Sequence, residues 1–96
     1  MNTTSARPLF DLGLIVITQG VKAILTEQNQ SKLDRFIAAH SVGDWGEIAV
    51  SDRLLNDEAI VKSGRIMSAY SLDNVRFWII TEADRSVTTL LLPSEY

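Results

Sequence analysis

The stretch Arg65-Ile-Met-Ser-Ala-Tyr-Ser-Leu-Asp-Asn-Val-Arg-Phe-Trp-Ile-Ile-Thr-Glu-Ala-Asp-Arg-Ser-Val-Thr-Thr-Leu-Leu-Leu92 decides the fold of this chain. Its β-branched and aromatic residues fall into three short runs, at about 65–70, 75–81 and 87–92, a pattern typical of strands. Polar segments at 71–74 and 82–85 supply the turns. Because both connections are short, we predict that the strands pair in sequence order as an antiparallel meander.

Upstream of this stretch, the sequence predicts one short strand and about three short helices. The β-branched run Leu14–Ile17 indicates the strand. Thr18 and Ser31 are the expected N-caps of the first two helices, and a third helix is expected from Ser51 to about Lys62. The fold class is therefore α+β, with the helices packed on the sheet.

Length and composition describe one small globular domain. The chain has 96 residues, of which 46% are hydrophobic and 22% charged, and we predict a flexible tail at 1–9 followed by a single domain at 10–96. The sequence has no cysteine, which excludes disulfides, thiolate catalysis and cysteine-based zinc sites. Its polar start lacks the apolar core of a signal peptide, so we expect a cytoplasmic protein without membrane attachment.

The charge balance argues against direct binding of nucleic-acid phosphates. The net charge is -3, and the nine Lys and Arg residues are scattered, whereas nucleic-acid-binding domains usually show a basic patch. The loop Gly43-Asp-Trp-Gly46 has neither the length nor the Lys-Ser/Thr ending of a phosphate-binding loop. No cofactor is predicted.

The predicted sheet is apolar on both faces. If the second hairpin is centred on Asp84, one face carries Val75, Phe77, Ile79, Val87, Thr89 and Leu91, and the other carries Trp78, Ile80, Thr88, Leu90 and Leu92. A sheet with one solvated side would alternate apolar and polar residues more regularly. Three short helices can cover one face, so the second requires the N-terminal segment, another subunit or a partner protein. Formation of a homodimer is therefore one open expectation.

His40 is the only histidine, and it allows two interpretations. As a functional residue it would act as a general base with Asp44, four residues further on, while Arg85 would hold an anion. As a structural residue it would be partly buried on its helix and bonded to a carbonyl or a carboxylate. One histidine with dispersed carboxylates makes a poor metal site, so no metal is predicted.

The candidate binding residues are Trp45, Arg65, Glu82, Asp84 and Arg85. Trp45 lies between two glycines, so it either projects as an anchor for a partner or folds back onto the core. The charged turn from Glu82 to Arg85 either recognises a polar ligand or is simply solvated. Arg65 is expected to form an ion pair with Glu82 on one sheet face.

Several motifs carry a resemblance to a known group of proteins. They are His40-Ser-Val-Gly-Asp-Trp-Gly46, Asp52-Arg-Leu-Leu-Asn56, Gly64-Arg-Ile-Met-Ser-Ala-Tyr70, and Trp78-Ile-Ile-Thr-Glu-Ala-Asp-Arg-Ser-Val-Thr88 with Leu91-Leu-Pro93. Through them, over about residues 40–96, the chain resembles small uncharacterised bacterial proteins carried by plasmids and integrative mobile elements. The resemblance implies a setting on bacterial mobile DNA and brings no activity with it.

Three functions follow as hypotheses. The first is a non-catalytic protein–protein interaction or regulatory accessory protein of a mobile element, for example a host-defence inhibitor of the anti-CRISPR or anti-restriction type. The second is a small hydrolase or ligand-binding enzyme that uses His40 and Asp44, with Arg85 as the anion clamp. The third is a dimeric nucleic-acid-associated regulator with a basic groove across two subunits. The lack of a catalytic motif favours the first hypothesis.

Overall fold

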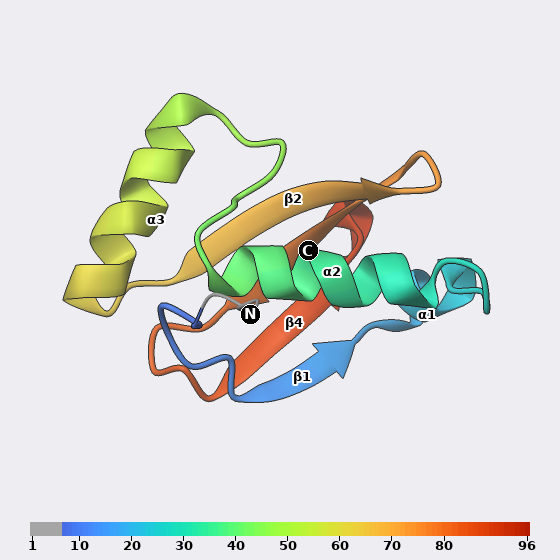
Figure 1. The fold of residues 1–96 in the computed structure, drawn as a ribbon, viewed down its shortest axis with the longest axis horizontal. Coiled ribbons are helices and arrows are strands. Elements are labelled where there is room, and N and C mark those ends of the chain that lie inside the picture. The colour runs from blue at the N-terminus through green and yellow to red at the C-terminus, as the bar shows by residue number, and fades with distance from the viewer. Residues whose placement is uncertain (1–6) are drawn as a thin grey trace, which may run out of the picture.

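Four strands form a single mixed sheet in the order β1–β4–β3–β2 (Figure 1). The bounds in this computed structural model, which describes residues 7–96, are β1 Leu14–Ile17, β2 Ile66–Leu72, β3 Val75–Thr81 and β4 Val87–Leu91. The predicted meander is confirmed, since β2, β3 and β4 pair antiparallel in sequence order. The N-terminal strand joins the same sheet by pairing parallel to β4, and this makes β1 an edge strand. The part of the predicted tail at 1–6 lies outside the described residues.

A two-residue turn connects β2 to β3. Asp73 and Asn74 have φ angles of 50° and 68°, and positive φ at both central residues defines the tight turn that suits the twist of a hairpin. Asp and Asn tolerate this left-handed conformation better than other residues with a side chain. Strand β2 therefore continues to Leu72, two residues beyond its predicted end.

The predicted hairpin centre at Asp84 is wrong by one position in register. Strands β3 and β4 pair Ile79 with Leu90, which centres the hairpin between Asp84 and Arg85. Arg85 takes a left-handed φ of 61°, which accommodates one more residue in the loop. Ile79 consequently shares its face with Leu90 and not with Leu91, because a shift of one residue moves a strand's side chains to the opposite face.

Three helices surround the sheet: α1 Gln19–Ile24, α2 Gln30–Ser41 and α3 Val50–Lys62. Helix α2 runs across one face, whereas α1 and α3 lie at the two ends (Figure 1). The predicted cap of α1 is confirmed, since the Thr18 hydroxyl accepts the Val21 amide at 3.4 Å. The predicted cap of α2 is wrong: Thr26 and Asn29 bond each other's backbone amides, and Asn29 takes the N-cap position instead of Ser31.

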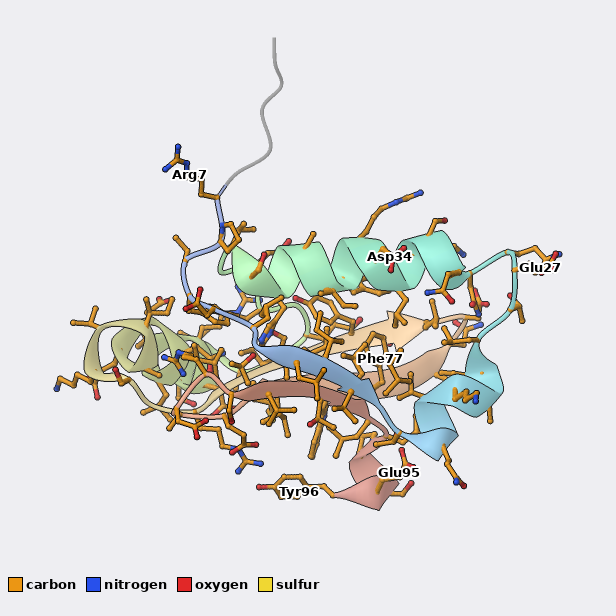
Figure 2. The ribbon with its side chains drawn as sticks, turned by 90° about the horizontal axis from the view of Figure 1, so that it is seen from below. Arg7, Glu27, Asp34, Phe77, Glu95 and Tyr96 are labelled. Atoms are coloured by element: carbon orange, nitrogen blue, oxygen red, sulfur yellow. The ribbon has the colours of Figure 1, made fainter. Side chains whose placement is uncertain are left out.

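The main core lies between α2 and the sheet face that it covers. Its buried members are Val21, Leu33, Tyr70, Leu72, Phe77, Ile79 and Leu90. A second, smaller cluster packs the C-terminal half of α3 against the start of β2, and its buried members are Trp45, Ala59 and Ile66. Phe77 lies between the sheet and α2 in the view of Figure 2. None of the helices within residues 7–96 is long and apolar enough to cross a membrane.

Candidate functional site

The sheet face opposite α2 has no helix across it in the described part of the chain (Figures 1 and 2). The strand registers give this face Leu14, Val16, Met67, Trp78, Ile80, Thr89 and Leu91. The N-terminal segment, one of the expected covers, instead extends the sheet as β1. The cover that is present is a short 3-10 turn, η1 Pro93–Glu95, followed by Tyr96.

A pocket opens on this face between α3, the sheet and Tyr96, and we call it the Tyr96 pocket. Its volume is about 210 Å³, and its lining residues are Asp52, Leu55, Asn56, Arg65, Met67, Ile80 and Tyr96. Met67 and Ile80 are sheet residues and form an apolar floor, while Asp52 and Arg65 contribute charges of opposite sign. Pockets for cofactors and drug-sized ligands measure roughly 300–1,000 Å³. The Tyr96 pocket is therefore of the right size for a single side chain.

Aromatic and cationic groups hold Tyr96 in place. Its ring and that of Trp78 form a T-shaped pair at a centroid distance of 5.6 Å, and the Arg65 guanidinium lies 5.1 Å from the Tyr96 ring centroid. Arg65 also donates from Nη1 to the Tyr96 hydroxyl at 2.6 Å. The predicted ion pair of Arg65 with Glu82 is confirmed, at 3.8 Å, but both groups are about half exposed, so it contributes little to stability.

Glu95 attaches the C-terminal turn to the start of α1. Its carboxylate accepts the Thr18 hydroxyl at 2.7 Å, the Gly20 amide at 3.0 Å and the Leu92 amide at 2.8 Å. These bonds lower the pKa of Glu95, and the bond from the Thr18 hydroxyl is the largest cause. Sequence reasoning missed this role, because Leu92 has no side-chain oxygen and Glu95, three residues later, supplies only the half of a capping box that bonds the N-cap amide. The turn that carries Tyr96 is thus fixed to a segment more than 70 residues away.

His40 belongs to the core, as its structural interpretation expects, but it is fully buried and not partly buried as predicted. Its Nδ1 lies 2.5 Å from the Ser68 hydroxyl, and its Nε2 lies 2.9 Å from the Thr81 hydroxyl. The predicted carbonyl or carboxylate partner is therefore wrong, since two hydroxyls take that place. Burial lowers the pKa of His40 from 6.5 to about 4, so the imidazole is neutral near pH 7.

The hydroxyls around His40 fix its tautomer. Thr88 donates to the Leu12 carbonyl at 2.6 Å, and Thr81 and Thr88 lie 2.7 Å apart. Because the Thr88 hydrogen is used on Leu12, Thr81 must donate to Thr88 and accept from Nε2 of His40. Nδ1 then accepts from Ser68. Every hydroxyl and ring N–H hydrogen in this hydrogen-bonded network has an acceptor. A second proton on His40 would occupy Nδ1 and remove the acceptor of the Ser68 hydroxyl.

The other sequence candidates are engaged in structural contacts. Trp45 folds back onto the core, the second of its two alternatives, and its Nε1 donates to the Asp57 carboxylate at 3.1 Å. Asp44 lies at the surface, where its backbone oxygen accepts the Tyr70 hydroxyl. Asp84 accepts the amide and the hydroxyl of Ser86, which closes its own turn.

Arg85 caps the end of α3. Its guanidinium donates to the carbonyls of Ala59 at 3.0 Å and Gly64 at 2.6 Å, and stacks at 5.5 Å over the Phe10 ring. The candidate binding residues therefore do not form one common site. Arg65 lines the Tyr96 pocket and Glu82 pairs with it, whereas Arg85 is used within the fold.

Comparisons with known proteins gave no match to a family model, to a curated protein or to a solved structure. Within residues 7–96, no group of three or more His, Asp and Glu side chains is placed to hold a metal ion. The resemblance to proteins of mobile elements stays a prediction. The function must accordingly be argued from the Tyr96 pocket and the surfaces around it.

Proposed function

We propose that this chain is a non-catalytic protein–protein interaction protein, and that the Tyr96 pocket receives an apolar side chain of its partner. The observation that carries this proposal is the pocket's position on the sheet face that no helix within residues 7–96 covers. Ile80 is only 3% exposed, so the open apolar surface here comes from half-buried Met67 and from exposed Leu55, and such surface is typical of a protein-binding site. The partner's side chain would contact Met67 and Ile80 and cover this part of the sheet face.

The composition of the pocket supports a protein partner. Aromatic residues and arginine are enriched at the centres of interfaces, and here Tyr96 and Arg65 stand together at the pocket. Leu55, on α3, adds exposed apolar surface beside it. Asp52 and Arg65 offer one negative and one positive group to polar atoms around the bound side chain.

The proposed setting is a bacterial mobile element, on the strength of the motifs over residues 40–96. Small accessory proteins of such elements act by binding, and inhibition of a host-defence system of the anti-CRISPR or anti-restriction type is one version of the proposal. In that version, the partner is a component of the defence system.

The hydrolase alternative finds no support in the geometry of His40. Both ring nitrogens bond hydroxyls in the core, and Arg85, the proposed anion clamp, donates to backbone carbonyls. A general base must reach the proton that it abstracts, and a fully buried imidazole does not reach a substrate in solution.

The nucleic-acid alternative is weakened by the pairing of the cations. Of the nine Lys and Arg residues, four lie within 4.0 Å of a carboxylate: Lys32, Lys62, Arg65 and Arg76. Their carboxylate partners would repel phosphates at the same surface. A mobility-shift assay at low salt tests this alternative, which would require a clear shift.

Two neighbouring leucines of α3 provide a matched test of the proposed function. Leu54 and Leu55 are 64% and 62% exposed, but only Leu55 lines the pocket. We expect the wild-type chain and Leu54→Glu to capture the same protein from a host lysate, and Leu55→Glu to lose at least about tenfold in affinity for it. Calorimetry with the purified partner measures the three affinities.

Equal affinity of both variants for that partner would remove the pocket from the interface. Failure of all three chains to retain any protein would contradict the proposed function itself. Both substitutions are at exposed positions, so unchanged thermal unfolding is the expected control result.

A further inference from the structure

The two edge strands of the sheet, β1 and β2, differ in how far their outward-facing backbone groups are hydrogen-bonded. Edge strand β2 points the backbone groups of Met67 and Ala69 outward, and all four are bonded. The side chain of Asn56 accepts the Met67 amide at 3.1 Å and donates to the Met67 carbonyl at 2.7 Å. Trp45 and Glu47 bond the amide and the carbonyl of Ala69. Edge β2 is therefore closed along Met67 and Ala69.

Edge strand β1 is open. The amides of Leu14 and Thr18 donate toward β4, to the carbonyls of Ser86 and Leu90, at 3.0 Å each. Because backbone groups alternate along a strand, Ile15 and Ile17 direct theirs away from the sheet. In the described chain no strand pairs with this side of β1, which ends the sheet order and faces the viewer in Figure 2.

Strand β1 also lacks the usual protection of a free edge. Charged residues, proline or a bulge normally prevent a free strand from pairing with another chain. The strand Leu14–Ile17 has none of them, and its four apolar side chains are 69%, 41%, 38% and 37% exposed. An edge that is both apolar and unbonded, in a chain that closes its other edge, has the properties of a pairing surface.

We propose that β1 pairs antiparallel with β1 of a second copy, around a two-fold axis at Val16. In this register Ile15 lies opposite Ile17 of the second copy, and each such pair exchanges both backbone hydrogen bonds. Two pairs give four bonds. The two four-stranded sheets become one continuous sheet, and the open backbone groups of both copies are satisfied.

A second copy fits this edge through symmetry. A two-fold axis places Val16 directly opposite itself, and β-branched pairs are favourable neighbours across strands. Each copy carries a net charge of -3, but β1 has no charged residue, so two copies that meet there make no like-charge contact along the strands.

The contact extends beyond the strands. A groove at the start of β1 is lined by Pro8, Phe10, Asp11, Leu12, Gly13, Ile15 and Arg85. The antiparallel register brings α1 of one copy toward this groove of the other, at both ends of the contact. Lys22, the charged residue of α1, is exposed, as is Asp11 in the groove, and the two charges are complementary.

Substitution at the two-fold axis gives a specific test. Wild-type chain is expected to sediment as a dimer at micromolar concentrations. Val16→Lys places two like charges opposite each other and should raise the dissociation constant at least about tenfold. An equimolar mixture of Val16→Lys and Val16→Glu should recover a heterodimer. Val61→Lys, at an exposed position of α3, is the control and should remain dimeric.

A wild-type chain that is monomeric at 100 micromolar, or a Val16→Lys variant as dimeric as Val61→Lys, would overturn the proposal. If Val16→Lys fails to fold, hydrogen exchange on the wild-type chain decides: the Ile15 and Ile17 amides must become protected as concentration rises. The surface is separate from the Tyr96 pocket, so Leu55→Glu should leave the dimer intact.

Discussion

Arg85 connects two parts of the molecule through one side chain. Its left-handed backbone sets the register of β3 against β4, and its guanidinium bonds the carbonyls at the end of α3. Both effects come from the same position in the chain. A non-glycine residue with positive φ costs free energy, and it persists where its surroundings require it.

Replacement of Arg85 by alanine should loosen α3. The substitution keeps the strained backbone but removes charge-assisted bonds to Ala59 and Gly64, at a cost of about 1–3 kcal/mol in unfolding free energy. Arg85→Lys should recover only part of this, because an ammonium group cannot reproduce the planar fork of a guanidinium. Urea denaturation measures the loss, with Arg35→Ala, at an exposed position of α2, as the control. Unchanged hydrogen exchange in α3 would contradict this role.

At the scale of elements, the sheet edges decide how the molecule meets others. Helix α3 closes β2 through Asn56, whose amide imitates the backbone of a neighbouring strand. The loop at Gly46 adds a parallel bridge to Ala69. Gly46 has a φ of 72°, and a Cβ there would lie 2.1 Å from the Ala69 oxygen, so only glycine allows the loop to approach this closely.

Removal of the Asn56 amide should open this edge. Asn56→Ala leaves the Met67 amide and carbonyl without partners, which we expect to cost about 1–3 kcal/mol in unfolding free energy. The Met67 amide should exchange faster with solvent, and the variant should aggregate at lower concentration than wild type, because edge β2 becomes free to pair with another chain. Glu58→Ala, which removes an exposed ion pair on the same helix, is the control and should behave as wild type. A Met67 amide that remains protected would show that Asn56 does not close the edge.

At the scale of the whole molecule, the hydrogen-bonded chain through His40 crosses the core. It runs from Ser68 on β2 through His40 on α2 to Thr81 and Thr88, and ends at the Leu12 carbonyl ahead of β1. Helix α2, three strands and the N-terminal segment share it. A buried polar network of this kind favours a single arrangement of the core when every member is satisfied.

The buried hydrogen-bonded network around His40 makes the unfolding free energy of the protein depend on pH. The pKa of His40 is about 4 in the folded state and 6.5 when unfolded, so the unfolded chain binds more protons between these values. Stability should therefore be greatest above pH 7 and fall by about 2 kcal/mol between pH 7 and pH 5. Since His40 is the only histidine, a variant with His40→Gln should lose this slope.

Urea denaturation from pH 7 to pH 5 measures the slope directly. The carboxyl groups of Asp73, Asp84 and Glu95 have lowered pKa values in the folded state. The stabilisation that they contribute is therefore lost at more acidic pH, when they become protonated. A flat profile for the wild-type chain over this range would contradict the burial of His40.

Local features of the fold could be predicted because they depend on residues close together in the chain. The alternating pattern at 65–92 predicts the meander, and Thr18 predicts the start of α1. The predicted register of β3 against β4 was wrong because the register depends on the backbone conformation of a single residue, Arg85. Of the site, the sequence predicted the pair of Arg65 and Glu82 and the apolar second face, but not the pocket.

The sequence by itself determined the strands, the turns and the absence of cysteine chemistry, because side-chain alternation and turn residues act over a few positions. The tertiary structure decided which segments meet. Only it placed β1 at an open edge beside β4, buried His40 and Trp45, and brought Tyr96 against Trp78. These contacts join residues far apart in the chain, and their free energy depends on how all elements pack together.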